Sequence, residues 1–215
     1  MSDQAVSHAE LMDATYRYQR RIYDLSRRYF LLGRDHLIAR LAPPKDASIL
    51  EIACGTGRNL SVIAARHPGC RLFGLDISEE MLRSARAKLG QTAVLKQGDA
   101  CRFDGATLFG QPKFDRIILS YSLSMIPDWH AALTAAAAHL AEGGELHVVD
   151  FGDQAELPRW FRSGLRAWLA KFHVAPRGDI ETALAATAAA AGQTAECRSL
   201  YRDYARYGVL RRSGH

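Results

Sequence analysis

The stretch "ILEIACGTGRNL", from Ile49 to Leu60, contains the first strand-to-helix turn of the fold and one residue that is unusual in a buried strand. Its first half has the apolar side chains of a strand inside a parallel sheet, yet Glu51 places a carboxylate among them. Gly55 and Gly57 then remove side chains where the strand turns into a helix. Such a turn lets a ligand approach the backbone and the free N–H groups of the next helix. The stretch therefore predicts a ligand site at the end of a central strand.

Strand-like and helix-like runs alternate along the chain on both sides of this turn. Such alternation predicts βαβ units and a doubly wound, mostly parallel sheet. The strand-like runs are Ile49–Cys54, Arg71–Asp76, Ala93–Gln97, Asp115–Tyr121 and Glu145–Phe151, and the helix-like runs between them are Arg58–Arg66, Glu79–Leu89 and His130–Ala141.

The last third of the chain departs from this rhythm. We expect a helix over Leu157–Phe172, and a second one from Asp179, its N-cap, to Ala191, with Gly192 as its stop. Two short strands, Glu196–Tyr201 and Tyr204–Leu210, are close enough in sequence to form an antiparallel hairpin at a sheet edge. The expected fold is thus α/β, with seven strands, an antiparallel C-terminal edge hairpin and an N-terminal helical extension.

The residues that follow the first three strands indicate the kind of ligand. Asp76, nineteen residues after Gly57, offers a carboxylate to both hydroxyls of a ribose. The third glycine of a dinucleotide fingerprint would fall at position 60, which is Leu60, and Glu51 would repel a pyrophosphate. A carboxylate there suits a cationic ligand instead. S-adenosylmethionine, with a sulfonium, an ammonium and a ribose, fits both observations.

The third strand ends in "QGDA", where Gly98 gives room for a flat ring and Asp99 accepts from an adenine amino group. The series E-x-x-x-G-x-G, then Asp76, then Gly98-Asp99 resembles the Rossmann-like S-adenosylmethionine-dependent methyltransferases over roughly residues 45–152. The resemblance implies a methyltransferase domain over 45–215, preceded by a helical extension or lid over 1–44. It also implies a set of cofactor-binding residues: Glu51, Ala53, Gly55, Gly57, Asp76, Ile77, Met81, Gly98, Asp99, Ala100 and Ser120.

Composition and charge limit the other classes of function. The first thirty residues lack the apolar core of a signal peptide and no run of about 18 apolar residues exists, so we expect a cytoplasmic protein without a membrane span. Neither C-x-x-C nor H-x-x-x-H spacing is present, so we predict no metal site. The net charge of +5 is concentrated between Tyr16 and Arg40, where seven arginines meet two aspartates. Such a segment favours an anionic partner.

Two segments, Tyr16–Leu41 and Leu157–Phe172, interleave aromatic and leucyl residues with arginines. This pattern is typical of helices that lie in a membrane interface, although apolar stripes that pack on the sheet would look the same. Two such helices beside one site favour an amphiphilic lipid substrate and peripheral contact with an anionic membrane surface, rather than nucleic acid. The stretches "IYDLSRRYFLLGRD" and "SYSLSMIPDW" are similar to those of the betaine-lipid methyltransferases. That resemblance implies trimethylation of the amine of diacylglyceryl-homoserine.

Three residues are candidates for the transfer itself: Tyr121, Arg34 and Tyr23. Ser120 and Tyr121 lie at the end of the fourth strand and are expected to face the sulfonium. Tyr23 and other tyrosines are candidates for an aromatic box around a quaternary product. Arg34 is a candidate anchor for a substrate carboxylate, with a surface ion pair to Asp35 or to a glutamate as the alternative.

Three other functions remain open from the sequence. One is N- or O-methylation of a soluble small molecule. Another is RNA methylation, against which stands the absence of an N-P-P-Y or D-P-P-Y motif after the fourth strand. The last is cofactor binding without catalysis.

Overall fold

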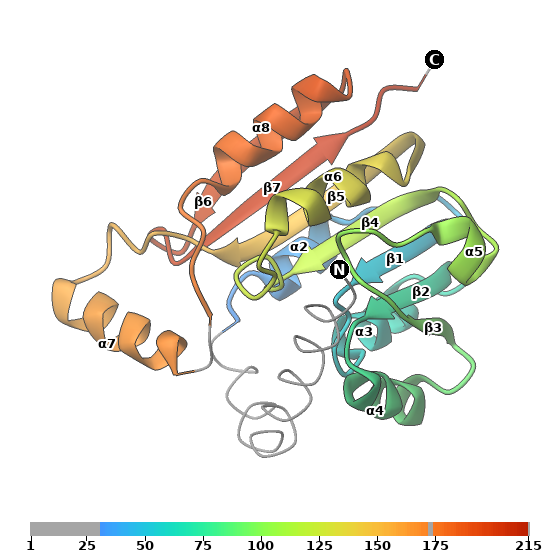
Figure 1. Cartoon of the computed structure of the whole chain (residues 1–215), viewed down its shortest axis with the longest axis horizontal. Coiled ribbons are helices and arrows are strands. Elements are labelled where there is room, and N and C mark those ends of the chain that lie inside the picture. The colour runs from blue at the N-terminus through green and yellow to red at the C-terminus, as the bar shows by residue number, and fades with distance from the viewer. Residues whose placement is uncertain (1–30, 172–173, 215) are drawn as a thin grey trace, which may run out of the picture.

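The computed structural model describes residues 31–171 and 174–214, and its centre is a seven-stranded sheet (Figure 1). Strands β1 to β5 run parallel to one another, and β7 lies antiparallel between β5 and β6, which gives the order β3-β2-β1-β4-β5-β7-β6. This confirms the predicted fold class. The strands are β1 (Ser48–Ile52), β2 (Arg71–Asp76), β3 (Ala93–Gln97), β4 (Phe114–Ser120), β5 (Leu140–Phe151), β6 (Thr194–Leu200) and β7 (Ala205–Arg211).

Helices cover both faces of the sheet, and each face has its own core cluster. On one face, leucines from α2, α3, α4 and α7 pack together. On the other, residues from α5, α6 and α8 do so. The helices are α2 (Arg34–Arg40), α3 (Arg58–Arg66), α4 (Glu79–Leu89), α5 (Gly105–Phe109), α6 (Trp129–Ala138), α7 (Arg159–Ala170) and α8 (Ile180–Ala190). In Figure 1 the arrowheads of β1, β2 and β4 point toward the side of the molecule on which α7 lies.

The predicted elements differ from the observed ones mainly at their ends. Helix α6 begins at Trp129, with Asp128 as its N-cap, but ends at Ala138 rather than Ala141. Leu140 instead pairs with Phe114 and extends β5 backward, with an irregularity between Phe114 and Arg116. Alanines alone do not distinguish these outcomes, because the pairing partner is distant in sequence. The short helix α5 was not predicted.

Of the predicted helix over Tyr16–Leu41, the described part is confirmed only from Arg34 onward, where α2 begins. Gly33 has a φ of 99° and caps α2, which interrupts any helix that approaches from residue 31. From there α2 packs into the core through Leu37 and Ile38, each 1% exposed. The buried guanidinium of Arg116 donates to the carbonyl of Leu41, 2.8 Å away, at the end of the helix. Helix α2 is thus packed with the sheet, although it lies in the predicted extension 1–44; that division stays a prediction.

Close packing beneath the β1–α3 turn depends on Gly74 in β2. A Cβ at this position would lie 2.6 Å from Leu95 Cδ2, 2.9 Å from Cys54 Sγ and 3.0 Å from Leu60 Cδ1. The residue at the third-glycine position, Leu60, is fully buried. It occupies the space that the missing side chain of Gly74 leaves.

We therefore expect Gly74→Ala to lower the free energy of unfolding by ~1–3 kcal/mol, as overpacking of a core does. The matched control is Gly164→Ala in α7, where a Cβ meets no atom within 4 Å. That change should raise helix propensity by up to ~1 kcal/mol. Urea unfolding followed by circular dichroism measures both. A Gly74→Ala protein as stable as the wild type would contradict this account of the packing.

Candidate cofactor site

The loop between β1 and α3 is fixed to the end of β2 by hydrogen bonds. The amide of Gly55 donates to Oδ2 of Asp76 at 2.7 Å, and the amide of Cys54 donates to the carbonyl of Leu75 at 2.9 Å. Gly57, at φ 71°, caps α3, and a Cβ there would lie 2.7 Å from Leu89 Cδ1 on α4. Gly57 therefore serves the packing of α3 against α4, in addition to shaping the turn.

Asp76 is 8% exposed and uses both carboxylate oxygens inside the protein. Oδ1 accepts from the amide of Ser78 at 2.9 Å, while Oδ2 accepts from Gly55. Each carboxylate oxygen has a second lone pair, so the group can still accept ribose hydroxyls while it holds the loop. Of the two neighbours expected in the site, Met81 is 3% exposed in the first turn of α4 and Ile77 is partly exposed beside Asp76.

Glu51 is 2% exposed, and one of its oxygens accepts from Nδ2 of Asn59 at 2.6 Å. It faces a cavity of about 50 Å³ at the carboxyl ends of β1 and β4, which we term the cofactor cavity. Arg34, 8% exposed, lines the same cavity. The full lining is Leu31, Arg34, Glu51, Ala53, Cys54, Gly55, Thr56, Arg58, Asn59 and Ser120. The guanidinium of Arg34 and the carboxylate of Glu51 thus line the same small cavity, which suits a ligand with a carboxylate and an ammonium.

Asp99 lies just beyond β3, at the same edge of the sheet. Burial acts to raise its pKa, but hydrogen bonds from the amide of Cys101 and the side chain of Arg102, both 2.9 Å long, outweigh it and lower the pKa. Asp99 is therefore a charged acceptor at neutral pH. At Gly98, a Cβ would lie 2.7 Å from Leu75 Cδ1, so the protein's own packing requires this glycine, which is a different reason from the one we predicted. Ala100 is partly exposed next to them.

The side chains of Ser120 and Tyr121, at the end of β4, have different surroundings. Ser120 lines the cofactor cavity, and its Oγ has no hydrogen-bond partner among the described residues. Tyr121, at φ 55°, is 2% exposed and donates from its hydroxyl to the carbonyl of Leu32. Its ring packs edge-on against Phe151, 4.7 Å away. Burial raises the pKa of Tyr121 well above its usual value, so the phenol stays protonated.

The predicted residue Tyr23 lies outside the described residues. Two other residues at the site, Asn59 and Asp150, were not predicted from the sequence. Asn59, which orients Glu51, has no sequence signal of its own. Asp150, fully buried at the end of β5, accepts from the amides of Ser124 (3.1 Å) and Phe151 (2.8 Å). The sequence does contain an indication of Asp150, because it is a carboxylate in an apolar strand, as Glu51 is.

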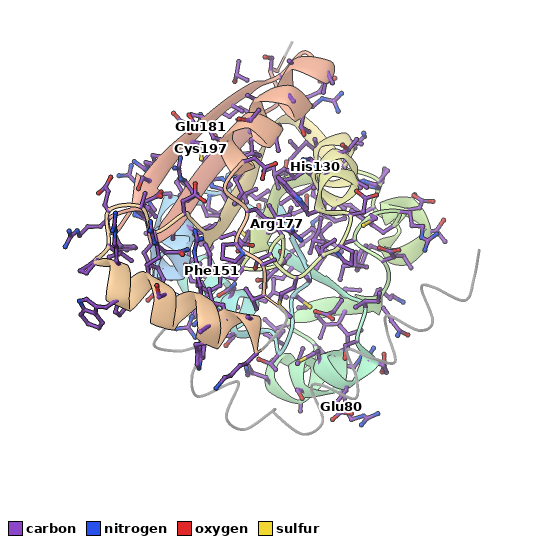
Figure 2. The ribbon with its side chains drawn as sticks, turned by 60° about the vertical axis from the view of Figure 1, so that its left-hand side comes forward. Glu80, His130, Phe151, Arg177, Glu181 and Cys197 are labelled. Atoms are coloured by element: carbon purple, nitrogen blue, oxygen red, sulfur yellow. The ribbon has the colours of Figure 1, made fainter. Side chains whose placement is uncertain are left out.

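A second connection supports the loop that follows β4. Arg177, labelled in Figure 2, lies on the segment between α7 and α8. Its guanidinium donates to the carbonyls of Leu123 at 3.2 Å and Ile126 at 3.1 Å. The loop after β4 is therefore held from Asp150 on one side and from Arg177 on the other.

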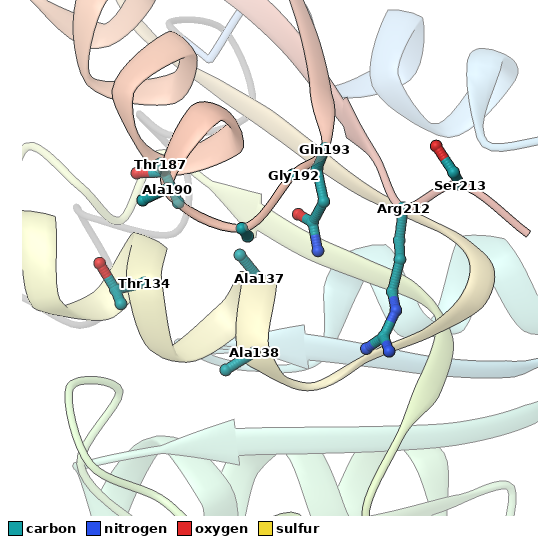
Figure 3. Close-up of a pocket in the computed structure, with 10 residues that line it drawn as sticks. Thr134, Ala137, Ala138, Thr187, Ala190, Gly192, Gln193, Arg212 and Ser213 are labelled. Atoms are coloured by element: carbon teal, nitrogen blue, oxygen red, sulfur yellow. The ribbon is translucent and has the colours of Figure 1, made fainter.

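A larger cavity, about 450 Å³ in volume, lies away from these residues (Figure 3). It is formed by the C-terminal ends of α6 and α8 and the end of β7, with Thr134, Thr187, Gln193 and Arg212 among its lining residues. The conserved geometry of open α/β sheets places ligands beyond the carboxyl ends of the parallel strands, so we assign the cofactor to the smaller cavity despite its size.

Within the described residues, no group of three or more His, Cys, Asp or Glu side chains is placed to hold a metal ion. None of the helices in this described part of the chain has the length and hydrophobicity that crossing a membrane requires.

We expect Asp76→Ala to weaken the binding of S-adenosylmethionine by ~1.5–3 kcal/mol, the value of hydrogen bonds to a charged group. Asp76→Asn is the matched control: it keeps the shape but not the charge and should have an intermediate effect. Isothermal titration calorimetry gives both dissociation constants. An unchanged constant for Asp76→Ala would remove Asp76 from the site.

Comparison with known proteins relates the chain to methyltransferases. Residues 50–146 match the family described as "Methyltransferase domain". The chain is 33% identical over 126 residues to the trans-aconitate 2-methyltransferase of Variovorax paradoxus, a match that covers 57% of this chain and 45% of that relative. The matched part thus spans less than half the length of this curated relative.

Solved structures show the same fold at low sequence identity. The plantazolicin methyltransferase BpumL, solved with SAH, superposes with a TM-score of 0.72 at 14% identity and covers 99% of this chain and 100% of its own. SAM-bound CalS10, an amino pentose methyltransferase from Micromonospora echinaspora, gives 0.63 at 20% identity, with 89% and 97% covered. These matches show that residues 50–146 are similar to a methyltransferase domain and that the chain has the Rossmann-like fold of the solved methyltransferases.

Proposed function

We propose that the protein is an N-methyltransferase that uses S-adenosylmethionine to trimethylate the amine of diacylglyceryl-homoserine, giving the betaine lipid diacylglyceryl-trimethylhomoserine. The sequence resemblance in "LLGRD" and "SYSLSMIPDW" names this substrate. The observation that carries the proposal is the outer surface of α7, which presents aromatic rings and arginines on the side of the molecule toward which β1, β2 and β4 point.

Helix α7 has two different faces. Leu165 and Leu169, 6% and 1% exposed, pack into the core cluster that also contains Tyr121. Trp160 and Phe161, 76% and 37% exposed, meet edge-on with ring centroids 5.7 Å apart. Arg159, Arg162 and Arg166 lie on the same helix. Large exposed rings with adjacent cations are what an anionic membrane interface binds.

Bound S-adenosylmethionine would supply an electrophilic methyl group, and the residues of this chain need to place a neutral amine in line with it. Alignment of this kind can supply up to ~7–11 kcal/mol of the barrier reduction. Proton transfer by Tyr121 does not fit, because its hydroxyl is bound to Leu32 and its pKa is raised by burial. Tyr201, 51% exposed in the turn between β6 and β7, remains a candidate aromatic face for a quaternary product.

A second candidate is methylation of a soluble small molecule. It is favoured by the similarity to trans-aconitate 2-methyltransferase, whose name gives a small carboxylic acid as its substrate. The two candidates differ in whether α7 contacts a membrane and in whether methyl groups enter a lipid.

We expect the protein to bind vesicles that contain anionic lipid and to release them as salt rises, since charges near a surface are screened within ~8 Å at physiological ionic strength. Trp160→Ala with Phe161→Ala should weaken this binding. The matched control is Val94→Ala on β3, which removes an exposed apolar side chain from a different edge of the sheet. Vesicle sedimentation measures all three proteins. Failure of the wild type to bind at low salt would contradict the interfacial role of α7.

The product is tested with purified protein, S-adenosylmethionine and diacylglyceryl-homoserine, with lipids followed by mass spectrometry. Each transfer needs the nitrogen to be neutral again, so mono- and dimethyl lipids should appear early and decline as the trimethyl lipid accumulates. Trans-aconitate and soluble homoserine serve as competing acceptors. Methylation of a soluble acceptor with no methylated lipid would overturn the lipid proposal and leave the methyltransferase assignment intact.

A further inference from the structure

Two of the three charged side chains that line the cofactor cavity come from segments that are distant in the sequence. Glu51 belongs to the central strand β1, whereas Arg34 is the first residue of α2. Both are at most 8% exposed. A buried guanidinium and a buried carboxylate that line one cavity present a donor fork and an acceptor to the same ligand.

We propose that Arg34 binds the carboxylate of the methionine part of S-adenosylmethionine, opposite Glu51, which takes its ammonium, and that Tyr121 is the positioning residue that holds Arg34 there. This inference deepens the cofactor site and is independent of the identity of the methyl acceptor. It replaces the prediction from sequence that Arg34 binds a carboxylate of the substrate.

The other arginine of the cavity is less suited to this role. The side chain of Arg58 is 38% exposed, and its Nη1 lies 3.8 Å from Oδ1 of Asp35. The alternative predicted from the sequence was an ion pair between Arg34 and Asp35, but the ion pair observed for Asp35 is with Arg58. Asp35 is 73% exposed and faces Arg58 instead.

The backbone next to Arg34 is fixed from two elements of the sheet. The hydroxyl of Tyr121, at the end of β4, donates to the carbonyl of Leu32. Gly33 lies against β5, since a Cβ there would lie 3.0 Å from Cγ2 of Val149. At the other end of α2, Arg116 donates to the carbonyls of Leu41 and Ala42, 2.8 Å and 3.1 Å away. These contacts set both the start and the end of the helix that carries Arg34.

The test compares two ligands that differ only in the group in question. Decarboxylated S-adenosylmethionine keeps the nucleoside, the sulfonium and the ammonium but lacks the carboxylate. Calorimetry on the wild type and Arg34→Met should show S-adenosylmethionine binding roughly 10- to 100-fold more weakly to the variant. The decarboxylated ligand should bind the variant at least as well as the wild type, which also shows that the variant is folded. Arg66→Met is the matched control: Arg66 is exposed at the end of α3 and does not line the cavity, so the change should alter neither constant by more than about threefold.

The role of Tyr121 is tested by a double-mutant cycle. Tyr121→Phe removes only the hydroxyl, so it should weaken S-adenosylmethionine binding in the wild type and have no further effect in Arg34→Met. It should leave the decarboxylated ligand unaffected, which a general loss of structure would not.

Two results would overturn the proposal. One is an equal loss for both ligands in Arg34→Met. The other is unchanged binding of S-adenosylmethionine together with a raised KM for the methyl acceptor, which would return Arg34 to the substrate side.

Discussion

The hydrogen bond from the amide of Gly55 to the carboxylate of Asp76, 2.7 Å long, is the constraint on which the site depends. It joins the loop after β1 to the end of β2, so the two parts of the site that would contact the methionine and the ribose keep a fixed separation. Gly74 in β2 allows the loop to take this position, because the lack of a side chain there leaves room for Cys54 and Leu60 to pack against the strand. Packing and ligand recognition therefore use the same few residues.

Local sequence patterns predicted the central part of the fold well. Helices α3 and α4 have the predicted ends, and β2 and β3 do as well. Glycine turns, apolar runs and short connections specify these elements without distant partners. The predicted helix over Tyr16–Leu41 has the expected end, but its break at Gly33 was missed. A long amphipathic pattern does not indicate this break, which is explained by contacts with β5 and with Tyr121. The early start of β5 likewise depends on a partner strand.

The same distinction holds for the site. Glu51, Asp76 and Asp99 were predicted because each follows or interrupts a strand as a charged residue. The position of Arg34 in the cofactor cavity was not, because it depends on where α2 begins. Tyr121 was predicted to face the sulfonium, but its buried hydroxyl donates to the carbonyl of Leu32, a contact that no sequence pattern indicates. Recognition of the acceptor depends most on distant contacts, and the exposed rings of α7 are the feature from which it is argued.

The most direct measurement is a crystal structure of the protein with bound S-adenosylmethionine. The account predicts the ribose hydroxyls at Asp76, the adenine amino group at Asp99, the ammonium at Glu51 and the carboxylate within hydrogen-bond distance of the Arg34 guanidinium. A cofactor bound with its ribose away from Asp76, or in the larger cavity between α6 and α8, would contradict the central claim that the carboxyl ends of β1, β2 and β4 form the cofactor site.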